Sequence, residues 1–239
     1  MTVDAAANRA TYKSGGVEVS GYFYRPSGTG PFPALLVLHG KSGLDKGPPA
    51  LALWLATQGY VAFAIDYFTP IGITPEKFDI SFYLNSVDQA REVQAQGLES
   101  LKSLPYVAPT RLGVVGQSLG GYFALILATR DDVKGVISYY GAFTGSPVTR
   151  ANTKYTVADI VAQVKAPVLM FQGDKDELVP IANANATQNL LINSGKQCEY
   201  YTYPGVGHAF DIKGGPTYDA NATADSQQKV LTFIKAKLE

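Results

Sequence analysis

The stretch Arg111–Ala128, RLGVVGQSLGGYFALILA, decides the fold that this sequence predicts. Residues 112–115 form an apolar run of the length of a buried strand, and residues 122–128 continue as an apolar run that fits a helix. Between them lies a Gly-x-Ser-x-Gly motif at residues 116–120, whose glycines keep side chains out of a crowded turn. The stretch therefore predicts a strand, a sharp turn at Ser118 and a helix.

Further apolar runs on both sides of this stretch predict the remaining strands. Continuous runs are typical of strands buried on both faces of a parallel sheet, whereas the alternation in residues 17–24 predicts an exposed edge strand. The predicted strands besides 112–115 are Val17–Tyr24, Pro33–Leu38, Val61–Ile65, Val133–Tyr140, Pro167–Phe171 and Glu199–Tyr203. Helical spacing of apolar residues is found in residues 51–57, 84–104, 120–129 and 230–238.

Alternating strands and helices predict an α/β protein, although periodicity alone leaves a doubly wound sheet and a barrel as alternatives. Two segments, about residues 67–81 and 142–156, are too long for plain connections, and loops of this length are often binding loops or lids. We expect a single domain over residues 1–239 in which these two segments are substrate-binding insertions.

The composition argues against several classes of protein. The 239 residues include 20 Lys plus Arg and 20 Asp plus Glu, and a formal net charge of zero is unlike that of a nucleic-acid-binding protein. There is no apolar run of about 18 residues that could span a bilayer, and residues 1–10 lack the apolar core of a secretory signal. Cys198 is the single cysteine, which excludes an intramolecular disulfide. We expect a cytoplasmic protein with no nucleic-acid or membrane partner.

The turn at Ser118 has the features of a nucleophile elbow. A serine on a strained strand-to-helix turn is lifted clear of the sheet, and the next amide, that of Leu119, can donate to an oxyanion from the helix N-terminus. A second oxyanion donor is expected from the loop after residues 33–38, and the amide of Lys41 is our candidate. The motif is weak by itself, because a glycine-rich helix cap with a capping serine would give the same pattern.

A serine hydroxyl needs a base to take its proton and an acid to orient that base. In elbow enzymes of this type the chain order is serine, acid, histidine. His39 precedes the serine, so His208 is the predicted base and His39 is expected to hold its own loop in place. The acid is expected after residues 167–171, where we prefer Asp176 to Asp174.

Taken together, five motifs in this order resemble the dienelactone hydrolase family of the α/β-hydrolase superfamily. The matching segments are Leu38–Gly40, Val61–Tyr67, Gly116–Gly121, Gly173–Pro180 and Gly207–Phe210, within a resemblance over about residues 15–238. The resemblance implies an α/β-hydrolase fold with a mostly parallel central sheet of about eight strands and helices on both faces. It also implies a triad of Ser118, Asp176 and His208, with no cofactor. We expect no metal site either, because the sequence has only two histidines.

The sequence departs from the dienelactone-specific branch of that family. Enzymes resembling that branch have a cysteine at the position of Ser118 and a glutamate at the position of Gly40. They bind the carboxylate of their substrate with arginines in two loops, and the corresponding residues 67–72 and 211–213 contain none here. The name of the family therefore does not settle the substrate.

We expect a serine carboxylesterase that cleaves small neutral esters through an acyl-enzyme intermediate. Its partner is a small-molecule ester or lactone, and it would be a monomer or a small homo-oligomer. Phe68, Phe143 and Phe210 are expected to line an apolar acyl pocket. A dienelactone hydrolase, a peptidase or amidase, and a catalytically silent binding protein on the same scaffold remain as alternatives.

Overall fold

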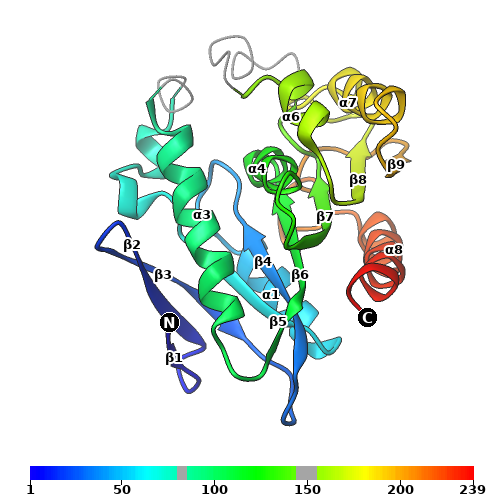
Figure 1. The fold of residues 1–239 in the computed structure, drawn as a ribbon. Helices are drawn as coiled ribbons and strands as arrows, with labels where there is room; N and C mark the ends of the chain where they lie inside the picture. The colour runs from blue at the N-terminus through cyan, green and yellow to red at the C-terminus, as the bar shows by residue number, and fades with distance from the viewer. Residues whose placement is uncertain (80–84, 144–154) are drawn as a thin grey trace.

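The central feature of the computed structural model is an open, twisted sheet. The structure describes residues 1–79, 85–143 and 155–239, and within them nine strands are hydrogen-bonded in the order β1-β2-β3-β5-β4-β6-β7-β8-β9. Figure 1 shows this sheet extending from the N-terminal strands at one edge to β9 at the other. Strands β5, β4, β6, β7, β8 and β9 are parallel to one another, and the pairs from β1 to β5 are antiparallel. The open order selects the doubly wound alternative over the barrel.

The strands are β1 Thr2–Asp4, β2 Arg9–Ser14, β3 Val17–Tyr24, β4 Phe32–Leu38, β5 Val61–Ile65, β6 Val107–Gln117, β7 Val133–Tyr139, β8 Val168–Gly173 and β9 Cys198–Tyr203. The α-helices are α1 Gly47–Thr57, α3 Val87–Lys102, α4 Leu119–Leu127, α6 Val157–Gln163, α7 Ile181–Asn193 and α8 Ala220–Leu238. The described ranges also contain two short 3₁₀ helices, η1 Thr69–Ile71 and η2 Pro75–Lys77.

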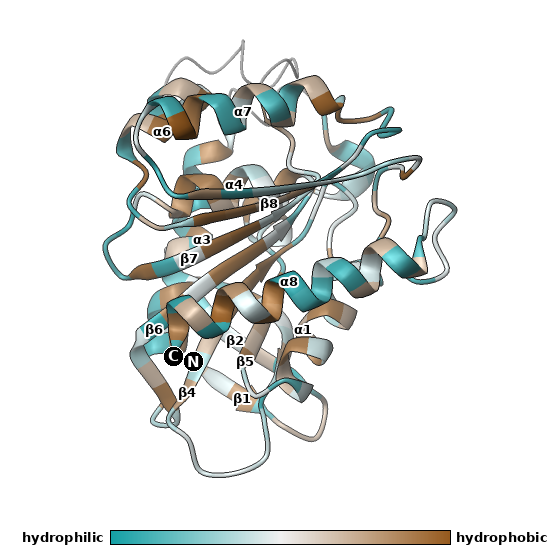
Figure 2. Ribbon diagram, turned by 90° about the vertical axis from the view of Figure 1, so that its right-hand side faces the viewer, coloured by the Kyte–Doolittle hydropathy of each residue, from teal (hydrophilic) through white to brown (hydrophobic). Residues whose placement is uncertain are grey.

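Helices cover both faces of the sheet, and the residues of β4 show how. Leu36 and Leu38 belong to the core on the side of α3, α4, α6 and α7, whereas Leu35 and Val37 belong to the core on the side of α1 and α8. All four side chains are completely buried. Since both faces are covered, the strand has no polar face, and this explains the continuous apolar runs in the sequence. Figure 2 shows that the inner strands are among the most hydrophobic parts of the ribbon.

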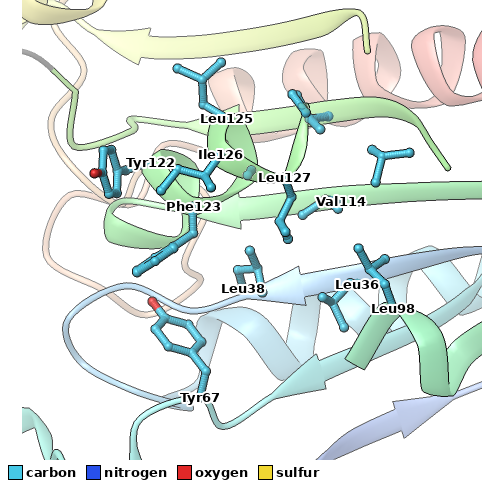
Figure 3. Packing of buried hydrophobic residues seen from close by; sticks show 14 of the residues in the cluster. Leu36, Leu38, Tyr67, Leu98, Val114, Tyr122, Phe123, Leu125, Ile126 and Leu127 are labelled. Atoms are coloured by element: carbon cyan, nitrogen blue, oxygen red, sulfur yellow. The ribbon is translucent and has the colours of Figure 1, made fainter. Parts of the chain in front are cut away.

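On the α4 side, aromatic rings join the helix to the loops beyond the strands. Figure 3 shows Phe123 of α4 next to Tyr67, which follows β5, and their ring centroids are 5.4 Å apart at 66°. Tyr67 in turn donates a hydrogen bond of 2.6 Å to the carbonyl of His39, which follows β4. These contacts hold together the segments that follow β4, β5 and β6, next to the site described below.

The structure corrects one prediction about the strands. Residues 17–24 are not an edge strand, because β3 pairs with β2 on one side and with β5 on the other. The described residues form nine strands, in line with the predicted sheet of about eight, and β1 and β2 extend this sheet beyond β3. Strand β2, RATYKS, was not predicted, since its apolar positions are interrupted by charged and polar residues.

The long segments and the helices also differ in part from the predictions. Within the first segment, residues 69–71 and 75–77 are short 3₁₀ helices, and residues 80–84 lie outside the described residues, as do residues 144–154 of the second. Helices α6 and α7 were not predicted; α7, IANANATQNLLIN, has few large apolar residues to mark a helical stripe. None of the helices in the described ranges is long and apolar enough to cross a membrane.

Candidate active site

The predicted turn at Ser118 is a sharp junction between β6 and α4. Ser118 has φ 56° and ψ −115°, and a positive φ is rare for residues other than glycine. A Cβ on Gly116 would lie 2.0 Å from the carbonyl oxygen of Gly120, and a Cβ on Gly120 would lie 2.2 Å from that of Leu38. Both positions therefore require glycine, as expected for a turn that packs a helix directly against the strands.

The structure brings His208 to Ser118 across ninety residues of sequence. Its Nε2 lies 3.1 Å from the Ser118 Oγ, and its Nδ1 lies 2.7 Å from the Oδ2 of Asp176. His208 is positioned by the loop after β9, where its carbonyl accepts a hydrogen bond from the Thr217 hydroxyl. The three side chains that the sequence predicted as a triad thus form a continuous chain of hydrogen bonds.

Asp176 is fixed by more than its contact with the imidazole. Its Oδ1 accepts hydrogen bonds from the backbone N–H groups of Leu178 at 3.0 Å and Val179 at 2.8 Å, and its Oδ2 accepts a third from Gln172 Nε2 at 2.8 Å. Burial by itself would raise the pKa of Asp176, but these bonds and the one from His208 hold the pKa below its ordinary value. The buried carboxylate therefore stays ionised and in one orientation.

Asp174, the other candidate for the acid, has a different role in the structure. Its Oδ1 accepts a 2.7 Å hydrogen bond from the N–H of Gly205, at the start of the loop that carries His208. The side chain is exposed, and so is that of Glu177. Geometry therefore favours Asp176 as the partner of the histidine, and Asp174 braces the neighbouring loop.

The two candidate oxyanion donors belong to segments that adjoin the serine. Leu119 is the first residue of α4, and an N–H at that position has no acceptor within its own helix. The loop containing Lys41 runs next to the serine, because a Cβ on Gly40 would lie 3.1 Å from the Ser118 Cβ and 3.7 Å from its Oγ. The oxyanion roles of Leu119 and Lys41 stay predictions.

His39 is completely buried and holds the loop after β4. Its Nδ1 donates to the carbonyl of Gly40 at 2.7 Å, and its ring stacks on Tyr67 with centroids 3.9 Å apart. Burial lowers the pKa of His39 to about 4, although the bond to Gly40 and the charge of Asp66 act in the opposite direction. The imidazole is therefore neutral, and its position agrees with the expected structural role.

The three phenylalanines predicted to line an acyl pocket lie in the packed interior. Phe68, Phe143 and Phe210 are 2%, 1% and 0% exposed. Phe68 packs edge-on against His39, with ring centroids 4.6 Å apart, whereas Phe210 packs on the other side of the sheet against Tyr203, 5.1 Å away. Their contacts are those of core residues. The sequence could not show this, because it places a ring near a loop but does not show which way the ring points.

Sequence reasoning missed Asp211, which lies three residues after His208. Its Oδ1 accepts a 2.5 Å hydrogen bond from the Tyr140 hydroxyl, and its Oδ2 accepts a 2.6 Å bond from Gln117 Nε2. The Tyr140 ring packs against the imidazole of His208, with centroids 4.5 Å apart. No sequence signal marks this group, because its partners are 71 and 94 residues away along the chain.

These side chains share one end of the sheet. Ser118 follows β6, Tyr140 follows β7, Asp176 follows β8 and His208 follows β9. The parallel strands therefore deliver all of them at their carboxyl ends, which is where open α/β sheets bind ligands. In the described residues, no group of three or more His, Cys, Asp or Glu side chains is placed to hold a metal ion.

Comparison with known proteins places this chain in a family. The profile of the dienelactone hydrolase family matches residues 19–238, nearly the whole chain. The chain belongs to the dienelactone hydrolase family. As a member of this family, it is a hydrolase of esters or lactones, and the resemblance seen in its motifs is confirmed.

Curated relatives cover the chain almost completely. The "Putative carboxymethylenebutenolidase" of Synechocystis sp. is 26% identical over 100% of both chains. The "Probable 2-oxo-3-(5-oxofuran-2-ylidene)propanoate lactonase" of Bradyrhizobium sp. is 28% identical over 90% of this chain and 88% of its own length. The names of both relatives describe hydrolysis of lactones.

A solved structure from the same family supports the fold. The "Putative Dienelactone Hydrolase" of Klebsiella pneumoniae superposes with a TM-score of 0.83 at 23% identity, over 95% of this chain and 98% of the other. The mostly parallel sheet with helices on both faces is therefore the α/β-hydrolase fold that the dienelactone hydrolase family shares, as predicted.

Proposed function

We propose that this dienelactone hydrolase family member is a serine carboxylesterase that acts through a Ser118–His208–Asp176 triad. The observation that carries the proposal is the unbroken hydrogen-bonded chain from the Ser118 Oγ through both nitrogens of His208 to a buried, ionised Asp176. This is the arrangement that activates a hydroxyl for attack on an acyl carbon.

The proposed reaction proceeds through an acyl-enzyme. Ser118 Oγ attacks the acyl carbon while His208 Nε2 takes its proton, and the Leu119 and Lys41 amides stabilise the oxyanion. His208 then returns the proton to the leaving alcohol as the tetrahedral intermediate collapses to the acyl-serine. Water, activated by the same imidazole, attacks the acyl-serine and releases the acid. Asp176 keeps the imidazole in the tautomer with hydrogen on Nδ1 throughout.

The preferred substrates are small neutral esters, with lactones as a second candidate class. Residues 67–72 and 211–213, where the dienelactone-specific branch carries carboxylate-binding arginines, contain no arginine. Lactones remain a candidate because the relatives in Synechocystis and Bradyrhizobium have lactonase names. A lactone is an internal ester, so the same triad would open it by the same two steps.

A fluorophosphonate probe and a panel of neutral p-nitrophenyl esters of increasing acyl length test the proposal. We expect covalent labelling of Ser118 and turnover of short esters, and Ser118→Ala should remove the labelling and lower kcat by about 10⁴-fold or more. Cys198→Ala is the matched control, because burial raises the pKa of this thiol to about 12 and keeps it protonated. Normal turnover in Ser118→Ala, or its loss in Cys198→Ala, would show that the mechanism is wrong.

The same experiment distinguishes the proposed esterase from the alternative functions. A catalytically silent binding protein would neither be labelled nor hydrolyse any ester in the panel. A peptidase or amidase would be labelled, and it would turn over the p-nitroanilide of a given acyl group in addition to the matching p-nitrophenyl ester. We expect turnover of the ester and no measurable turnover of the anilide.

A further inference from the structure

Asp211 connects three separate segments around the candidate triad. Gln117 directly precedes Ser118 at the end of β6, Tyr140 directly follows β7, and Asp211 itself lies in the loop that carries His208. Each of the two partners donates to a different oxygen of the carboxylate, at 2.6 Å and 2.5 Å. The segments that carry the nucleophile Ser118 and the base His208 are thereby linked through a carboxylate that is not part of the triad.

The two hydrogen bonds favour the ionised form of Asp211. A carboxylate accepts hydrogen bonds at both oxygens, and both neighbours donate here. Burial raises the pKa of Asp211, while the bonds from Tyr140 and Gln117 and the nearby His208 act against that shift. The pKa of the Tyr140 hydroxyl is itself raised well above its usual value, mainly by burial and then by the charge of Asp211, so it remains a donor.

Other charged and titratable groups surround this carboxylate. A pocket of about 280 Å³ lies beside it, between α1, α8 and the loop after His208. Its ionisable lining groups are Asp211, Lys46, Lys213, Tyr139 and Tyr218, and Asp45 acts on Tyr140 from the loop after β4. The two lysine side chains are exposed to solvent, and among the described residues no ion pair is found between either of them and Asp211.

We propose that Asp211 is a positioning residue of the triad: held by Tyr140 and Gln117, its carboxylate fixes the Tyr140 ring against His208 and stabilises the imidazolium that forms during catalysis. The inference rests on the proposed function, in which His208 carries a positive charge in each transition state. Asp176 holds one edge of the imidazole by a direct bond, and Tyr140 packs against the ring. Asp211 acts through Tyr140 and through its negative charge.

Asp211→Asn tests the proposal, with Asp174→Asn as the matched control on the adjacent loop. We expect Asp211→Asn to lower kcat for p-nitrophenyl acetate about tenfold with little change in KM. The loss of a negative charge disfavours the imidazolium, so the midpoint of the acidic limb of the pH profile of kcat/KM should move to lower pH, by about half a pH unit or more. Asp174→Asn should change neither quantity.

A fall in kcat without a shift of the midpoint would mean that Asp211 only supports the fold, and it would overturn the proposal. Unchanged kcat and an unchanged midpoint would overturn it as well. Should Asp211→Asn not fold, Asp211→Ser carries the test, because it also removes the negative charge and the midpoint should move in the same direction. Its control is Asp174→Ser, which removes a carboxylate from the adjacent loop. An unmoved midpoint in Asp211→Ser contradicts the proposal.

Ser118→Ala, measured in parallel, keeps the two proposals apart. If Ser118→Ala is inactive and Asp211→Asn behaves like Asp174→Asn, only the role of Asp211 is wrong. If Ser118→Ala retains activity, the proposed function itself is wrong.

Discussion

Ser118 shows how the surrounding chain maintains a single unfavourable residue. Its left-handed backbone costs about 1–3 kcal/mol for a residue with a side chain. Its N–H donates to the Tyr139 carbonyl at 2.9 Å, and its own carbonyl accepts from Gly121 at 2.9 Å and Ala142 at 3.1 Å. These bonds join the turn to β7 and to α4, so the strained conformation persists and presents the hydroxyl to His208.

The division between Asp176 and Asp174 leads to a prediction at the same scale. Asp176→Asn would leave the imidazole of His208 in the wrong tautomer and should lower kcat by about 10⁴-fold. Asp174→Asn keeps an oxygen that can accept from the N–H of Gly205, so its kcat should stay within a few-fold of the wild type. Steady-state kinetics on one neutral ester checks both variants, and the opposite ranking would transfer the acid role to Asp174.

The buried His39 should make the free energy of unfolding depend on pH. Its folded-state pKa of about 4 is below the ordinary value of 6.5, so between these values the unfolded chain binds a proton that the folded chain does not. The contribution of His39 is fully present above pH 6.5 and is lost as the pH falls towards 4, by about 3 kcal/mol over the whole window. The contribution of Asp176, whose pKa is lowered from 3.8, is lost only at still lower pH.

Urea unfolding between pH 7 and pH 4.5 measures this effect. The free energy of unfolding of the wild type should fall with pH, and His39→Asn should flatten the fall, because asparagine can still donate to the Gly40 carbonyl but does not titrate. The comparison uses the slope, so a general loss of stability in the variant does not affect it. An equal slope in both proteins would mean that another group causes the dependence.

At the scale of elements, the contact of β6 and α4 with β4 depends on glycine. Gly120→Ala would place a Cβ 2.2 Å from the Leu38 carbonyl and push α4 away from β4. We expect a loss of at least about 2 kcal/mol in the free energy of unfolding, together with most of kcat. Gly195→Ala is the control, since its φ of 69° makes it strained while no atom lies within 4 Å of its Cβ. It should lose about 1 kcal/mol and no kcat. Equal losses in both variants would refute the packing argument.

Whether an element could be predicted from the sequence depends on whether its signal is local or comes from tertiary contacts. The β6 turn and the inner strands have signals that are local: glycines that flank a serine, and apolar runs such as residues 33–38. Strand β2 and helix α7 are stabilised by tertiary contacts rather than by their own pattern, so their sequences did not reveal them. The partners of Asp211 meet only when β6, β7 and the loop after β9 are brought together, which one sequence does not show.

At the scale of the whole molecule, the placement of charge predicts substrate preference. A buried carboxylate without a paired cation costs several kcal/mol, and residues 67–72 and 211–213 supply Lys213 but no arginine. We expect kcat/KM for a dienelactone carboxylate to be at least ~10-fold below that for its neutral methyl ester, or ~1.4 kcal/mol. The methyl ester has the same ring without the charge, and following the opening of the lactone ring alone keeps cleavage of the added ester group out of the comparison. Equal values for the pair would show that a cation such as Lys41 pairs with the carboxylate.

The central position of β6 in the sheet has a consequence for how the molecule opens. In the described residues, five strands lie on one side of β6, in the order β4, β5, β3, β2 and β1. Strands β7, β8 and β9 lie on its other side. The hydrogen-bonded N–H of Ser118 therefore cannot be released without separating inner strands, and we expect it to exchange hydrogen only through global unfolding. Heating should accordingly leave no partly unfolded, inactive intermediate: loss of turnover and loss of the sheet should occur together, in one cooperative transition.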